Sequence, residues 1–151
     1  MRHSWGVEAE LGTDGPKVIL VAIDGSTTSM RAGSYAAGLA RRQGSRLVVA
    51  HVVHPPTMVM APQAAPAALE AAEEVLEQLR SEVERGAAWV GFDIEFRTAY
   101  GNPYGELLKL AEEVRAELVV LGASEALGHR VLGSLGARMI KAGRWPVTVV
   151  P

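Results

Sequence analysis

The hydrophobic positions of this chain form two alternating patterns, short apolar runs and longer amphipathic stretches. Nearly unbroken apolar runs cover residues 18–23, 47–53 and 118–121, and a shorter run covers residues 147–150. Such runs predict strands of a parallel sheet that is covered on both faces. Residues 92–97 instead alternate between apolar and charged side chains, which predicts a half-exposed strand at an edge of the sheet.

The amphipathic stretches between the apolar runs predict four helices. The first is capped by Thr27 or Thr28 and ends near Gln43, with Gly44 as the residue that follows its end. Asn102, which is followed by a proline, fits the cap of the third helix. The apolar spacing of the second and fourth helices places them over residues 69–83 and 134–142.

Strands and helices therefore alternate from residue 17 to the last residue, with no internal repeat and no linker. We predict a single α/β domain, residues 17–151, built on an open parallel sheet of five strands with helices on both faces, a Rossmann-like architecture. Residues 1–16, which are rich in glycine, are expected to form a flexible N-terminal tail. Residues 54–66, which contain several prolines, are expected to form a mobile loop.

The composition argues against several classes of function. The net charge of −2 at pH 7 provides no electrostatic basis for binding DNA or RNA. The chain contains no cysteine, and His51 and His54 have no matching set of ligands nearby, so no metal site is predicted. Glu8 and Glu10 interrupt the region where a signal peptide would be apolar, and no apolar run reaches the roughly 20 residues of a membrane span. We therefore expect a cytoplasmic protein without membrane insertion.

Candidate chemistry lies at the ends of the predicted strands. Asp24 follows the first strand, and the fourth strand leads through a glycine-containing loop to Gly133 and Ser134 at the start of the last helix. Ligands of open parallel sheets bind at the carboxyl ends of the strands, and helix N-termini attract phosphate. The pattern predicts a nucleotide site, although an aspartate in a turn and a serine at a helix start also serve as ordinary caps.

Five short motifs of the chain together resemble the universal stress protein family over residues 17–151. They are Val21-Ala-Ile-Asp-Gly-Ser26, Val49-Ala-His-Val-Val53, Gly101-Asn-Pro103, Leu118-Val-Val-Leu-Gly122 and Pro146-Val-Thr-Val-Val150. The resemblance implies a UspA-like domain of the adenine nucleotide alpha hydrolase-like fold, with strand order 3-2-1-4-5. It also implies frequent homodimers, and ATP binding in one subgroup of the family.

The ATP-binding subgroup has an aspartate at the end of its first strand and a valine at the end of its second, and both contact adenosine. The resemblance implies these roles for Asp24 and Val52. The subgroup's phosphate loop reads Gly-x2-Gly-x9-Gly-Ser/Thr, and the loop of this chain matches it at its first and last elements. The candidate phosphate contacts are Gly122, Gly128, Arg130, Gly133 and Ser134.

The middle of the loop departs from the subgroup's pattern. Glu125 stands where the second glycine is expected, and seven residues separate it from Gly133 where the pattern has nine. A carboxylate beside a polyphosphate disfavours binding by about 1–4 kcal/mol at near-contact distance. The expected cofactor is ATP or another adenine nucleotide, with Mg²⁺ or Mn²⁺ for a triphosphate, and the alternative is that the protein binds none.

Two functions therefore stay open. In the first, the chain is a stress-response or signalling protein that binds an adenine nucleotide between the first and fourth strands. No residue is placed as a general base, so we expect that the protein is not an enzyme and hydrolyses ATP slowly at most. In the second, it is a homodimeric interaction module without a ligand. Under both, the final strand pairs with its copy, with Trp145, Val147 and Val149 at the seam.

Overall fold

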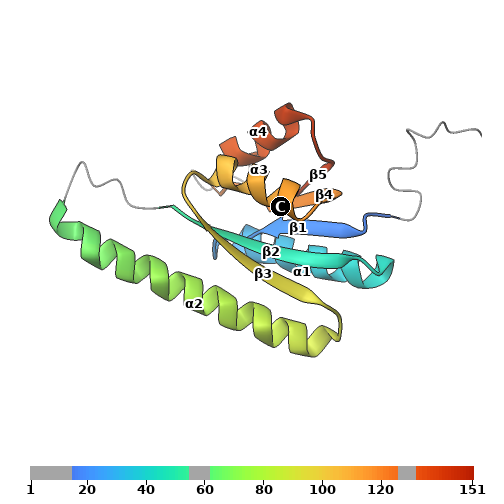
Figure 1. Ribbon diagram of the computed structural model, residues 1–151, viewed down its shortest axis with the longest axis horizontal. Coiled ribbons are helices and arrows are strands. Elements are labelled where there is room, and N and C mark those ends of the chain that lie inside the picture. Colours follow the sequence, from blue (N-terminus) through green and yellow to red (C-terminus); the bar gives the residue numbers. More distant parts are fainter. Residues whose placement is uncertain (1–14, 55–61, 126–131) are drawn as a thin grey trace, which may run out of the picture.

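The computed structural model describes residues 15–54, 62–125 and 132–151, in which strands and helices alternate along the chain (Figure 1). Most of the expected N-terminal tail and of the loop at 54–66 lies outside these residues. The described strands are all parallel and form one sheet in the order β3-β2-β1-β4-β5, as predicted. They are β1 (Val18–Ala22), β2 (Arg46–Val53), β3 (Ile94–Tyr100), β4 (Leu118–Gly122) and β5 (Val147–Val150).

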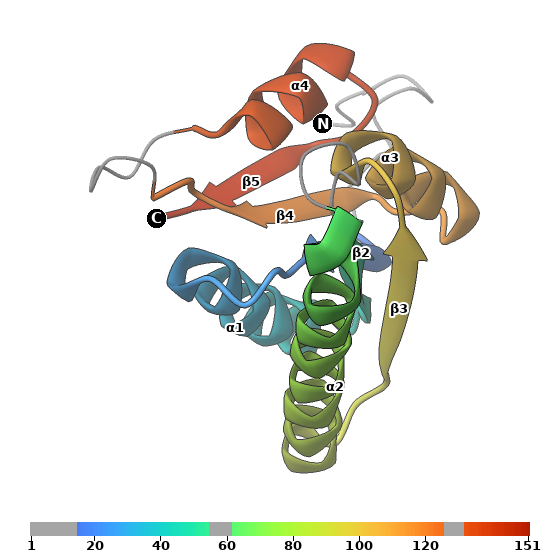
Figure 2. The ribbon, with the colours of Figure 1, turned by 90° about the vertical axis from the view of Figure 1, so that its left-hand side faces the viewer.

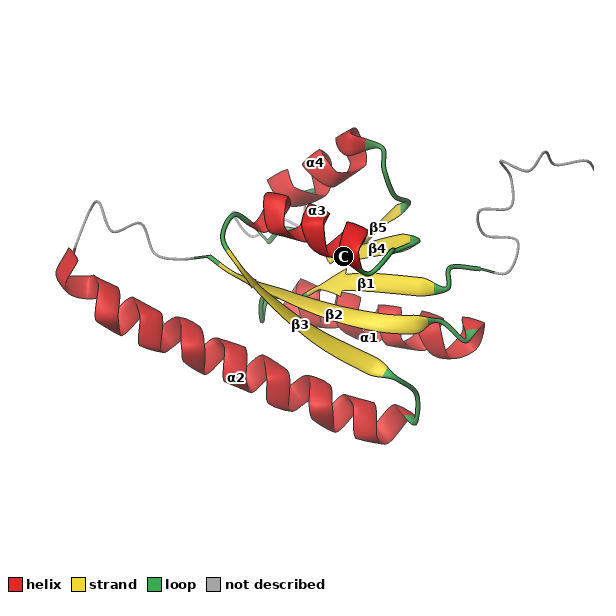
Figure 3. Cartoon of the chain, viewed as in Figure 1, coloured by secondary structure: helices red, strands yellow, loops and turns green. Residues whose placement is uncertain are grey.

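Helices cover both faces of the sheet, so the domain has three layers (Figures 1 and 3). One face carries α1 and α2, and the other carries α3 and α4. The helices are α1 (Thr27–Gln43), α2 (Ala65–Val90), α3 (Pro103–Glu113) and α4 (Ser134–Ala142), and a short 3-10 turn, η2 (Pro62–Ala64), precedes α2.

The alternation of side chains along each strand divides the core into two clusters, one on each face of the sheet. In β1, Ile19 and Val21 point to the cluster that includes α1, whereas Leu20 points to the cluster beneath α3 and α4. All three side chains are fully buried. Burial on both faces explains why the central strands read as continuous apolar runs instead of alternating ones.

The sequence located the helices but misplaced some of their ends. Thr27 and Thr28 were wrong as caps of α1, because the hydroxyl of Ser26 accepts a hydrogen bond from the backbone N–H of Ser29. Helix α2 extends well beyond residues 69–83 at both ends and begins inside the expected loop. Its added first turn consists largely of alanine, which favours helix strongly but carries no apolar pattern that marks a face.

Helix α1 approaches β4 more closely than a side chain at residue 122 would permit. A Cβ atom added to Gly122 would lie 2.5 Å from the backbone nitrogen of Ser29 and 2.5 Å from the carbonyl carbon of Thr28. The hydroxyl of Thr28 in α1 also donates a hydrogen bond to the carbonyl oxygen of Ala123, the residue after β4, at 2.5 Å. Gly122 is therefore required by the packing of the first turn of α1 against the end of β4.

We expect Gly122→Ala to lower the free energy of unfolding by about 1–3 kcal/mol, because the new methyl group would push backbone against backbone. Urea denaturation followed by circular dichroism measures the change. Gly38→Ala is the matched control, since Gly38 lies inside α1 with no atom within 4 Å of an added Cβ. The control should stabilise the protein by about 0.5–1 kcal/mol. Equal stability of Gly122→Ala and the wild type would contradict the packing argument.

Candidate functional site

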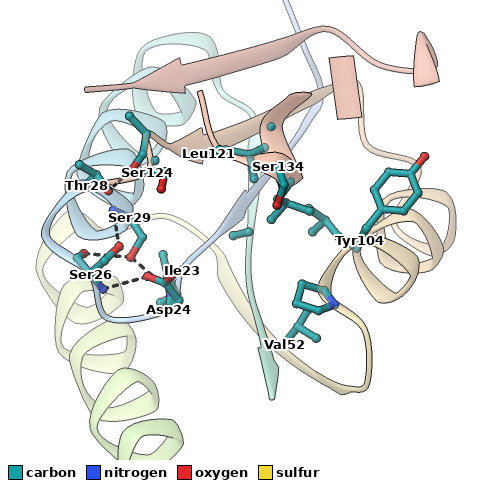
Figure 4. Close-up of a pocket in the computed structure, with 18 of the residues that line it drawn as sticks. Ile23, Asp24, Ser26, Thr28, Ser29, Val52, Tyr104, Leu121, Ser124 and Ser134 are labelled. Atoms are coloured by element: carbon teal, nitrogen blue, oxygen red, sulfur yellow. Dashed lines mark hydrogen bonds between the residues drawn. The ribbon is translucent and has the colours of Figure 1, made fainter. Parts of the chain in front are cut away.

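A cavity of about 430 Å³ opens at the carboxyl ends of β1 and β4, where the strand order reverses (Figure 4). Asp24 and Ser26 lie on one side of it, and Val52 and Tyr104 lie on the opposite side, with Ser134 between them (Figure 4). The first pair comes from the turn between β1 and α1, and the other residues come from β2, α3 and α4. The topology of the sheet therefore gathers residues that are far apart in the sequence.

The turn after β1 holds Asp24 at the edge of the cavity. Its carboxylate accepts a hydrogen bond from the backbone N–H of Ser26 at 2.9 Å, and its own N–H donates to the hydroxyl of Ser29 at 3.1 Å. Burial alone would raise the pKa of Asp24, but hydrogen bonds from Ser26 and Ser29 and the electrostatic effect of His51 outweigh it and lower the pKa. Asp24 is therefore an ionised hydrogen-bond acceptor at neutral pH.

His51 in β2 and His54, which follows β2, each lie within hydrogen-bond distance of a backbone carbonyl oxygen in a neighbouring loop. Nδ1 of the buried His51 lies 2.9 Å from the carbonyl oxygen of Ile23, and Nδ1 of His54 lies 3.2 Å from the carbonyl oxygen of Gly101. In the part of the chain that the structure describes, no three His, Cys, Asp or Glu side chains gather as metal ligands. Both histidines thus hold the loops that border the cavity.

Three of the described helices begin at the cavity, and their N-termini differ in how they are capped. Ser26 caps α1 through its side chain, and the side-chain oxygen of Asn102 caps α3 by accepting from the N–H of Gly105 at 3.2 Å. The cap of α4 is Gly133, which has no side chain to offer. The first backbone N–H groups of a helix have no partner within the helix. Those of α4 thus receive no hydrogen bond from the side chain of their N-cap residue, and they carry the positive end of the helix dipole.

The structure brings together the predicted site residues that it describes. Five of the predicted site residues line the cavity: Asp24, Val52, Gly122, Gly133 and Ser134. Gly128 and Arg130 lie outside the described residues. Glu125 also lines the cavity.

Tyr104 and Arg138 are among the lining residues that the sequence analysis did not identify as site residues. Tyr104 lies in the first turn of α3, and Arg138 lies one turn after Ser134 in α4. The guanidinium carbon of Arg138 is 3.9 Å from the centre of the Tyr104 ring. The sequence does carry a signal for Arg138. It lies four residues after Ser134, and this spacing places Ser134 and Arg138 on the same face of α4.

Comparison with known proteins identifies the family of this chain. The model of the universal stress protein family matches residues 16–151. The chain belongs to the universal stress protein family. A universal stress protein of Methanocaldococcus jannaschii is 30% identical over 140 residues, which cover 89% of this chain and 81% of that relative.

Solved structures of universal stress proteins share the fold. UspA from Lactobacillus plantarum has a TM-score of 0.76 at 22% identity, over 89% of this chain and 97% of that one. A universal stress protein solved in complex with cAMP has a TM-score of 0.59 at 28% identity, over 89% and 96% of the two chains. Among the described helices of this universal stress protein, none has the length and apolarity to cross a bilayer.

The lowered pKa of Asp24 makes stability depend on pH. A carboxylate whose native pKa lies below its unfolded value stabilises the fold above about pH 3.9, and this stabilisation is lost as the pH falls through the native pKa. Asp24→Asn should therefore be less stable than the wild type at neutral pH and should approach it in acid. Urea midpoints across that pH range test this.

Asp93→Asn is the control, because Asp93 is exposed and makes no hydrogen bond or ion pair with the described residues. A stability difference between Asp24→Asn and the wild type that stays constant with pH would contradict the assignment.

Proposed function

We propose that this universal stress protein binds an adenine nucleotide in the cavity between β1 and β4. The supporting observation is that the α4 N-terminus, which has no side-chain cap, borders the same cavity as the ionised Asp24. Such a cavity offers a hydrogen-bond acceptor at one side and backbone donors at another. A relative of 28% identity has been solved in complex with cAMP, an adenine nucleotide.

The nucleoside part fits the side of the cavity formed by β1 and β2. Asp24 would accept hydrogen bonds from ribose hydroxyls, and Val52 and Ile23 would provide apolar surface for the base. Val52 is only partly buried, so its side chain is available for such contact. Shape and apolar contact would position the base, with a small number of polar groups fixing its orientation.

The phosphate part fits the start of α4. Ser134 would donate its hydroxyl, and the backbone N–H groups that follow Gly133 would donate along the helix axis. Glu125 opposes a high negative charge at this end of the cavity. For a triphosphate, Mg²⁺ or Mn²⁺ bound with the ligand would reduce that repulsion, and we assign no catalytic role to any residue.

Nucleotide binding would make the protein a ligand-responsive stress protein, with the cytoplasm as its expected location. A ligand shifts a conformational equilibrium only by the difference between its affinities for the two conformations. The biological response therefore depends on which conformation of the protein binds the nucleotide more tightly. The proposed activity is ligand binding without turnover.

Isothermal titration calorimetry with adenosine, AMP and ATP tests the proposal. We expect the wild type to bind at least one of them, and Glu125→Gln to bind ATP more tightly by about fivefold or more, since about 1 kcal/mol of repulsion is removed. The gain should be larger for ATP than for adenosine. Glu113→Gln, an exposed residue of α3 outside the cavity, is the charge-matched control.

Absence of binding of all three ligands at millimolar concentration would exclude the proposal and leave the interaction module as the function. Equal affinities of wild type and Glu125→Gln for ATP would refute the role of Glu125 alone.

We also propose that the protein dimerises through β5, the last strand beside β4 (Figure 2). The carbonyl groups of Pro146 and Val150 accept hydrogen bonds from the strand β4 and the residue after it. Because backbone groups alternate in direction along a strand, those of Val147 and Val149 point to the open edge. Trp145 packs partly against the core beside α3 and α4, so the backbone of the edge is the main contact surface.

Val149→Pro should convert the dimer to a monomer, because it removes an outward N–H while leaving the bonds to β4 in place. Sedimentation velocity of wild type and variant at several concentrations measures the change, and circular dichroism confirms that the variant is folded. A folded variant with the mass of the wild-type dimer would contradict this interface, and so would a monomeric wild type.

A further inference from the structure

Arg138 is the cation among the described residues that line the cavity. It lies one helical turn after Ser134, so both residues occupy the face of α4 that borders the cavity. The other charged lining residues in the described part are the carboxylates Asp24 and Glu125. A guanidinium at this position therefore offsets negative charge at the end of the cavity assigned to phosphate.

The guanidinium of Arg138 is held by an aromatic ring and not by a carboxylate. Ion pairs of the described residues involve other arginines and lysines, and none includes Arg138. Its carbon lies 3.9 Å from the centre of the Tyr104 ring, which is within the range of a cation–π interaction. A stacked guanidinium keeps the N–H groups of its edge available for an anion, because stacking uses only its flat face.

Tyr104 and Arg138 connect two walls of the cavity. Tyr104 belongs to the first turn of α3 and is half-buried, whereas Arg138 belongs to α4 and is exposed. The ring restricts the long arginine side chain, which lowers the entropy lost when an anion binds. The planar edge of a guanidinium matches two oxygens of a phosphate, so a phosphate monoester or diester is the class of anion that it suits.

We propose that Arg138, positioned by Tyr104, makes this site select phosphorylated adenine ligands over the unphosphorylated nucleoside. The inference rests on the proposed function, since it identifies a specificity-determining residue of that same cavity. Arg138 contacts the phosphate, and Tyr104 acts through Arg138 as a positioning residue.

Calorimetric titration of the full chain with AMP and with adenosine tests the inference, because the two ligands differ by one phosphate. The wild type should bind AMP more tightly than adenosine. Arg138→Gln should weaken AMP binding by about tenfold or more, as expected for the loss of a charged hydrogen bond, and should leave adenosine binding unchanged. Lys141→Gln removes the same charge from the last turn of α4, outside the cavity, and should change neither affinity.

Variants of Tyr104 separate positioning from simple packing. Tyr104→Phe keeps the ring and should keep the AMP preference, whereas Tyr104→Leu should reduce it by about threefold, the size of a surface cation–π contact. In the Arg138→Gln background, Tyr104→Leu should cause no further loss of the ratio of AMP to adenosine affinity. An additional loss there would overturn the role of Tyr104 as a positioning residue.

The outcomes distinguish this inference from the proposed function. A wild type that binds AMP and adenosine, with an unchanged ratio in Arg138→Gln, would overturn the inference while nucleotide binding stands. A wild type that binds neither ligand would overturn both. Thermal denaturation of each variant confirms that a change in affinity does not come from unfolding.

Discussion

The close contact between the end of β4 and the first turn of α1 organises the edge of the sheet where the cavity lies. Gly122 leaves room for the backbone of Thr28 and Ser29, and the hydroxyl of Thr28 donates to the carbonyl oxygen of Ala123. Because α1 begins directly after β1, this contact also fixes the turn that carries Asp24. Backbone packing thus sets the geometry of this part of the site, which would lower the cost of ordering it for the proposed ligand.

The helices that begin at this edge differ in their N-terminal caps. Helices α1 and α3 have side-chain caps from Ser26 and Asn102, whereas the cap of α4 is Gly133. A glycine cap costs a helix only a few tenths of a kcal/mol relative to serine or asparagine. The stability lost at α4 is therefore small, while its first backbone donors face no competition from the side chain of their own N-cap residue.

The sequence predicted the fold well because the sheet and helix patterns are set by burial. Continuous apolar runs marked the central strands. Because the strands are parallel, the residues that follow them lie together at the carboxyl edge of the sheet. What it could not predict depends on contacts between distant segments. Ser26, Thr27 and Thr28 are all suitable caps by type. In the structure Ser26 caps the helix, while the hydroxyl of Thr28 bonds to Ala123 in a distant segment. Gly122 matched a phosphate-loop pattern, yet the structure gives it a packing role.

The contact between Tyr104 and Arg138 also joins segments that are distant in the sequence, and it bears on the ligand selectivity proposed for the site. The described lining carries two carboxylates and one guanidinium, so its net charge does not by itself attract an anion. At an effective dielectric constant of about 20, a charge pair is worth about 4 kcal/mol at 4 Å and about 2 kcal/mol at 8 Å. A shift of a few ångströms along α4 thus changes the balance between attraction to Arg138 and repulsion by Glu125. Discrimination among adenine nucleotides in such a site depends on where the phosphates lie, while the contacts to the nucleoside stay the same.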